Sequence, residues 1–124
     1  MKAIVIDDSR ATRTILKRTL AAQGFEVFEA GDGRAAIEEL EKTGPLDLAL
    51  VDWNMPVMTG YEFIVEIRSR AQFGSMSIMM VTTESETSQV QLALDAGANE
   101  YIMKPFTEDV LKEKLMLLGL SQDI

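Results

Sequence analysis

Five short apolar segments alternate with stretches of helical periodicity along the whole chain. They occupy residues 2–7, 25–30, 47–52, 77–82 and 100–103. Apolar runs of this length predict buried strands, and the alternating run at 25–30 predicts a half-buried one. Because strands that alternate with helices form a parallel sheet covered on both faces, the pattern predicts a (βα)5 doubly wound α/β fold.

The helices between these strands have recognisable ends. Ser9 precedes the first helical pattern and Gly24 follows it. Thr59 can cap the third helix, Ser85 is expected to cap the fourth, and Thr107 the last. The positions that recur at helical spacing in the first helix are Thr12, Ile15, Leu16, Thr19 and Leu20.

Composition removes several classes of function. The 124 residues include no cysteine and no histidine, which excludes disulfides, thiolate nucleophiles and imidazole bases. Any metal must be held by oxygen, which favours a hard cation such as Mg²⁺. The net charge of −8 disfavours nucleic acid, and no apolar run approaches a membrane span or a signal peptide. We expect a cytoplasmic monomer that binds neither nucleic acid nor membranes.

Polar side chains follow four of the predicted strands. Asp7 and Asp8 follow the first, Asp52 ends the third, Thr82 ends the fourth, and Lys104 follows the fifth. Ligands of open parallel sheets bind beyond the carboxyl ends of the strands, so these groups should converge. Three neighbouring carboxylates repel one another, and a divalent cation relieves that repulsion.

The predicted rim has a definite chemistry. A carboxylate not consumed in binding metal can attack phosphorus and form an acyl phosphate. The cation and Lys104 would neutralise charge on the transferring phosphoryl group, and Thr82 could donate a hydrogen bond to it. Taken alone, an acid at the end of a strand is more often a turn or cap residue, so the interpretation depends on the combination.

The combination resembles a known family. The segment 51–60, VDWNMPVMTG, has hydrophobic-Asp-x-x-Met-Pro-x-Met-x-Gly spacing and stands with the segments IDD at 6–8, MVT at 80–82 and KPF at 104–106. Over essentially all 124 residues the chain is similar to receiver (response regulator) domains, of the stand-alone CheY-like type. The resemblance implies a flavodoxin-like sheet of order 2-1-3-4-5 and one receiver domain over 1–124, with no output domain.

The resemblance also implies roles for the acidic residues. Asp52 would be the phosphoacceptor. Asp8 would bind Mg²⁺ directly and Asp7 largely through water. Asp52 and the backbone carbonyl of Asn54 would complete the protein ligands.

Further residues acquire roles in the same way. Thr82 and Lys104 would contact the phosphoryl group. Thr82 and Tyr101 would form the switch, in which the hydroxyl moves toward the phosphoryl group and the ring turns inward. The Lys104–Pro105 peptide resembles one that is cis in the family.

Two positions depart from the family pattern. Thr83 stands where Ala is usual, and its stiff β-branched side chain could narrow the path of attacking water and slow dephosphorylation. Asn54 and Glu84 flank the site and, with Thr83, would modulate turnover. Thr59 stands where Asp is common, and because both residues cap helices we expect no functional effect.

The resulting hypothesis is a phosphorylation-activated switch of two-component signalling. Without histidine the chain cannot be the phosphohistidine donor, so a histidine kinase or small acyl phosphate must supply the phosphoryl group. The family implies an effector face over residues 85–118 and an effector such as a flagellar motor switch protein in chemotaxis. Beyond its own phosphotransfer and autodephosphorylation, no enzyme activity is expected.

Three alternatives stay open. One is a phosphorelay intermediate. Another is a phosphatase of the haloacid-dehalogenase type, although that chemistry wants an acid where the chain has Asn54. The third is a flavodoxin, although Asp7 and Asp8 would repel the phosphate of a flavin nucleotide.

Overall fold

The computed structural model describes residues 1–120 and, at Glu84, the backbone alone. Within that range it contains a five-stranded parallel sheet of order β2-β1-β3-β4-β5, which confirms the predicted fold and strand order. The strands are β1 (Lys2–Ile6), β2 (Glu26–Ala30), β3 (Leu48–Asp52), β4 (Ser77–Thr82) and β5 (Glu100–Met103).

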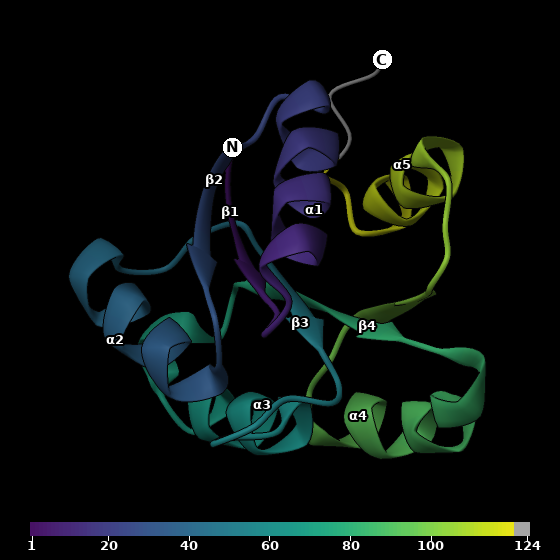
Figure 1. The fold of residues 1–124 in the computed structure, drawn as a ribbon. Coiled ribbons are helices and arrows are strands. Elements are labelled where there is room, and N and C mark those ends of the chain that lie inside the picture. Colours follow the sequence, from purple (N-terminus) through teal and green to yellow (C-terminus); the bar gives the residue numbers. More distant parts are fainter. Residues whose placement is uncertain (121–124) are drawn as a thin grey trace.

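Helices cover both faces of this sheet (Figure 1). They are α1 (Arg10–Ala22), α2 (Gly33–Thr43), α3 (Gly60–Arg68), α4 (Val90–Ala96) and α5 (Glu108–Leu117). Two short 3-10 helices, η1 (Ala71–Phe73) and η2 (Glu84–Gln89), lie between them. Helices α1 and α5 pack on one face, and α2, α3 and α4 pack on the other. Two separate apolar clusters result, and β1, β3 and β4 contribute alternate residues to each.

Most predicted helix ends are confirmed. Ser9, Thr59 and Thr107 cap α1, α3 and α5 through their side chains. Ser85 as a cap of the fourth helix is wrong. The chain first forms η2, whose N-cap residue is Thr83, and α4 begins only at Val90 with Gln89 as its N-cap residue. Residues 83–89 are called the β4–α4 segment below.

The inner stripe of α1 is narrower than the helical spacing suggested. Leu16 and Leu20 are buried, but Ile15 is 61% exposed. Ile15 instead lines an open cavity of about 570 Å³ between α1 and the loop that carries Pro105 and Phe106. The Lys104–Pro105 peptide is cis, as the resemblance implied.

One arginine ties the far end of α4 to the rest of the fold. Arg68, at the end of α3, donates from Nε to the carbonyl of Gly97 at 2.9 Å and from Nη1 to that of Phe73 at 3.0 Å. Its Nη2 donates to the side chain of Asn99 at 2.7 Å, and that same oxygen accepts the amide of Ile78. The C-terminal end of α4 is therefore bonded to α3, η1 and the sheet.

No helix among residues 1–120 is both long enough and apolar enough to cross a bilayer.

Candidate functional site

Strand register places the acidic residues together. Ile6 of β1 pairs with Val51 of β3, so Asp7, which follows β1, and Asp52, the last residue of β3, emerge at the same edge of the sheet. Carboxylate oxygens of Asp7, Asp8 and Asp52 all lie within 4.8 Å of one another. These three residues are called the acid cluster below.

Two of the three members of the acid cluster are largely withdrawn from water, whereas Asp8 is exposed. Asp7 is 1% exposed and Asp52 is 9% exposed. Together with Thr82, they are the buried polar or charged residues of the part of the chain that the structure describes. Because burying an ionised group is costly unless it is paired, such a concentration of buried polarity at one edge marks a functional site.

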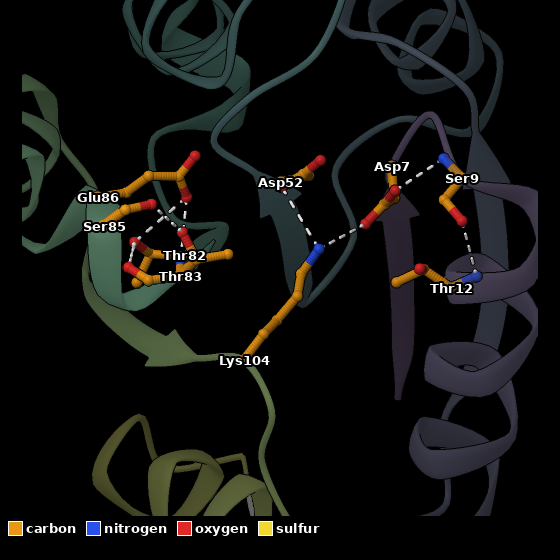
Figure 2. Close-up of polar contacts among 9 residues, drawn as sticks. All are labelled: Asp7, Ser9, Thr12, Asp52, Thr82, Thr83, Ser85, Glu86 and Lys104. Carbon is orange, nitrogen blue, oxygen red and sulfur yellow. Dashed lines mark hydrogen bonds and ion pairs between the residues drawn. The ribbon is translucent and has the colours of Figure 1, made fainter.

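Lys104 lies between two of the carboxylates (Figure 2). Its Nζ is 3.3 Å from Oδ2 of Asp7 and 3.6 Å from Oδ1 of Asp52. The backbone amide of Lys104 donates to the carbonyl of Thr82 at 2.6 Å, which fixes the start of this side chain beside β4. One cation therefore faces a cluster of three acids, and the charge is only partly balanced.

Asp7 is held from both sides. The backbone amide of Ser9 donates to its Oδ1 at 2.8 Å, while Nη1 of Arg13 donates to its carbonyl at 2.6 Å. Ser9 also caps α1, so the same residue orients the helix and the carboxylate. Sequence reasoning missed the roles of Ser9 and Arg13 at Asp7.

Asp52 has an unusual proton affinity. Burial raises its pKa from 3.8 to about 6. Lys104 and the backbone amide of Asn54 oppose this shift, whereas the neighbouring Asp7 and Asp8 add to it. At neutral pH the side chain is mostly a carboxylate, but one whose charge the site disfavours. A cation in the acid cluster would remove that penalty.

The start of α3 packs directly on the end of β3. A Cβ at Gly60 would lie 2.7 Å from the carbonyl oxygen of Asp52 and 2.9 Å from Cα of Trp53. Only glycine therefore permits this approach, and the amide of Gly60 donates to the carbonyl of Trp53 at 3.1 Å. This contact explains the glycine at the end of the 51–60 segment.

The predicted switch residues lie apart from the acid cluster. The hydroxyl of Thr82 is engaged within the β4–α4 segment, as Figure 2 shows. Tyr101 lies on β5, where Nζ of Lys114 stands 4.3 Å from the centre of its ring. The hydroxyl of Thr83 is 3.0 Å from that of Ser85. The side chain of Glu84, predicted to modulate turnover, lies outside the described residues.

The donor set fits a magnesium ion. The carboxylates converge, the sequence has no histidine or cysteine to compete as a ligand, and hard oxygen donors are what Mg²⁺ prefers. Asn54 is exposed and its amide faces Asp52, while the role of its carbonyl as a ligand stays a prediction.

Comparison with known proteins agrees with the fold and the site. The family model described as the response regulator receiver domain matches residues 3–116. The chain belongs to this family, whose members are phosphorylation-activated switches of two-component signalling rather than classical enzymes. Nothing in the match supports a phosphatase.

Within the family, chemotaxis proteins are close relatives. The chain is 46% identical over 121 residues to the chemotaxis protein CheY1 of Helicobacter pylori, covering 96% of this chain and 98% of the relative. The chemotaxis protein CheY4 of Vibrio cholerae has 36% identity and a TM-score of 0.86, with 94% and 97% covered. The receiver domain of a Pseudomonas aeruginosa sensor histidine kinase has 26% identity and a TM-score of 0.84, with 95% and 97% covered.

Proposed function

We propose that Asp52 accepts a phosphoryl group from a histidine kinase and that this modification changes how the chain binds an effector protein. The observation that carries the proposal is the acid cluster with Lys104 inserted beside it. A buried acid with a raised pKa, two further carboxylates and a lysine form a site suited to phosphoryl transfer, in which positioning and charge neutralisation dominate.

The acid cluster would hold Mg²⁺, with Asp8 and Asp52 as direct ligands, Asp7 acting through water and the Asn54 carbonyl completing the set. The ion would supply charge neutralisation for the phosphoryl oxygens. A magnesium ion is coordinated in the active-site cleft of the Pseudomonas receiver domain, which supports the same assignment here.

The chain's own residues would perform the transfer. A carboxylate oxygen of Asp52 attacks phosphorus, and the bond from phosphorus to the imidazole nitrogen of the kinase breaks, so the imidazole leaves with the electron pair. Lys104, already 3.6 Å from Asp52, would pair with the incoming phosphoryl oxygens. Thr82 would donate its hydroxyl to them after leaving its present partners.

The structural response to phosphorylation would occur at β4 and β5, on the far side of the sheet from Asp7. The new group brings about −1.5 to −2 charge at the position of one carboxylate, and Thr82 and Tyr101 would respond. We assign effector binding to residues 85–118, which include exposed Leu92, Met103 and Val110.

The names of the relatives favour chemotaxis as the process that this switch controls. A flagellar motor switch protein is then the effector that we propose. A phosphorelay intermediate is the competing role. It would pass the phosphoryl group on to a histidine phosphotransfer domain, whereas a motility regulator would bind its effector and keep the group until hydrolysis.

We also propose that Thr83, together with Asn54 and Glu84, sets the lifetime of the phosphoryl group. Replacing Thr83 by alanine should widen the path of attacking water and speed dephosphorylation. A Thr83→Ala variant that loses phosphate no faster than the parent chain would count against this role. The single domain over 1–124 and the cytoplasmic location stay predictions.

The decisive experiment is intact mass spectrometry after incubation with acetyl phosphate, with and without Mg²⁺. We expect one phosphoryl adduct that requires Mg²⁺ and that is absent in Asp52→Asn. The exposed Asp95→Asn serves as the matched control and should form the adduct normally. An adduct that forms without Mg²⁺, or that survives in Asp52→Asn, contradicts the proposal.

A further inference from the structure

The hydroxyl of Thr82 is directed away from Asp52 in this structure. Thr82 is fully buried, and its Oγ1 donates to the carbonyl of Thr83 at 3.1 Å. The same Oγ1 lies 3.5 Å from Oε1 of Glu86 (Figure 2). Because a hydroxyl has one proton, it can donate to only one acceptor at a time. Donation to a phosphoryl group on Asp52 would require both of these partners to be given up.

Glu86 also holds the backbone against which Thr82 rests. Its Oε1 accepts the amide of Thr83 at 3.0 Å, and its own amide donates to the carbonyl of Thr83, also at 3.0 Å. One carboxylate oxygen thus reaches both Thr82 and the next peptide. Glu86 follows Thr82 by four residues and Thr83 by three, so its carboxylate reaches back across a single turn of η2.

We propose that Glu86 is a positioning residue that retains Thr82 in the unphosphorylated arrangement and so opposes the response to a phosphoryl group. This inference rests on the proposed function, because it concerns the same Thr82 hydroxyl. The carbonyl of Thr83 is available whatever the sequence, but the carboxylate depends on the side chain at position 86. The carboxylate lies 3.5 Å from the hydroxyl and offers it a second acceptor beside the carbonyl of Thr83, so its loss removes one of the two acceptors that compete with the phosphoryl group and should favour the rearranged state.

The equilibrium can be measured with beryllium fluoride as a phosphoryl mimic in the presence of Mg²⁺. Trp53 is the single tryptophan and adjoins Asp52, so its fluorescence reports occupancy. We expect Glu86→Ala to lower the apparent Kd for the mimic about 5-fold, the effect of one hydrogen bond of ordinary net strength. Glu86→Gln keeps an acceptor oxygen without the charge and should lower the Kd about 2-fold.

A second background separates positioning from simple loosening of η2. Thr82→Val removes the hydroxyl with almost no change in shape. In that background Glu86→Ala should no longer alter the Kd, because no hydroxyl remains to be retained. If Glu86→Ala has the same 5-fold effect with Val at position 82, Glu86 acts through the stability of the segment and the proposal is overturned.

Ser85→Ala is the matched control for the β4–α4 segment. It removes the contact between the hydroxyls of Thr83 and Ser85 but leaves Glu86 in place, so the Kd should not change. An unchanged Kd in folded Glu86→Ala would refute the retaining role alone, provided that acetyl phosphate still gives the Mg²⁺-dependent adduct on Asp52. Absence of that adduct in the parent chain would instead refute the proposed function.

Discussion

The acid cluster and the β4–α4 segment are neighbours at one edge of the sheet, but different interactions hold them. The acid cluster follows buried strands and is held by the Ser9 amide and Lys104. The β4–α4 segment is a 3-10 turn in which the hydroxyls of Thr83 and Ser85 contact each other and the carboxylate of Glu86 accepts the backbone amide of Thr83.

This difference separates two tasks. A group that accepts a phosphoryl must be preorganised, because catalysis depends on charges that do not rearrange during the reaction. A group that reports the phosphoryl must have two arrangements of similar free energy. Strand ends suit the first task, and a short segment held by side-chain hydrogen bonds suits the second. The following substitutions test this division, beginning with the largest expected effect.

Replacing Lys104 by methionine should slow phosphorylation of Asp52 by acetyl phosphate about 10²–10³-fold, because the fixed positive charge beside the transferring group is lost. Initial rates of adduct formation by mass spectrometry measure the effect. Lys42→Met, at an exposed position of α2, is the matched control and should react normally. A reduction below 10-fold would mean that the acid cluster does not depend on a preorganised cation.

Asp52→Asn should stabilise the metal-free protein at neutral pH. The folded pKa of about 6 exceeds the ordinary value of 3.8, so the folded state binds the proton more tightly. Tighter proton binding by Asp52 stabilises the folded state fully below pH 4, and this stabilisation is lost as the pH rises through 6. The penalty above pH 7 is about 3 kcal/mol.

Urea unfolding in EDTA at pH 4 and pH 7.5 checks this prediction. The variant should gain free energy of unfolding at the higher pH relative to the parent chain and little at the lower. Asp95→Asn, an exposed acid, should show no such difference between the two pH values. Equal effects of Asp52→Asn at both pH values would show that charge burial is not what it relieves.

Val57 tests whether backbone strain in the loop after β3 contributes to the function of the acid cluster beside it. Its φ of 69° lies in the left-handed region, which is costly for a β-branched residue, and its side chain is 78% exposed. Val57→Asn should raise the free energy of unfolding by about 1 kcal/mol.

Phosphorylation by acetyl phosphate should stay within 2-fold of the parent rate in Val57→Asn. The matched control is Val65→Asn, an exposed position inside α3 with helical backbone, which should gain no stability. A large change in the phosphorylation rate of Val57→Asn would show that backbone strain belongs to the acceptor chemistry.

Lys114→Met should have the smallest effect. Its Nζ contacts the ring of Tyr101 at 4.3 Å and pairs with Glu100 at 3.0 Å, and neither charge is deeply buried. We expect a loss of about 0.5–1 kcal/mol in urea unfolding and a change in the NMR signals of the Tyr101 ring. The rate at which Asp52 is phosphorylated should not change, since the Tyr101 ring takes part in the response to phosphorylation and not in the transfer itself.

Most of the fold was predictable because buried parallel strands appear in sequence as short apolar runs. The acidic edge was predictable for a related reason, since Asp7 and Asp52 directly follow or end such runs. The exposure of Ile15 was not predictable, because helical spacing identifies a face but not what lies opposite it. That α1 face borders the open cavity instead.

The β4–α4 segment shows where periodicity fails. Its cap was predicted at Ser85, although Thr83 and Glu86 form a Thr-x-x-Glu pattern that is typical of helix starts. That signal was present and would have placed the cap correctly. The proximity of Glu86 to Thr82 depends instead on the tight 3-10 turn, which no spacing rule revealed.

Arg68 attaches the C-terminal end of α4 to the rest of the fold, but its hydrogen bonds to the described residues do not include the N-terminal end of that helix. Its guanidinium binds the carbonyl at Gly97, where a Cβ would lie 2.7 Å from Cγ of the arginine, so the arginine side chain lies close against the backbone there. The other end of α4 continues from the β4–α4 segment. Because only its C-terminal end is held by Arg68, a rearrangement around Thr82 would rotate α4 about that end more readily than it would move the whole helix away from the sheet.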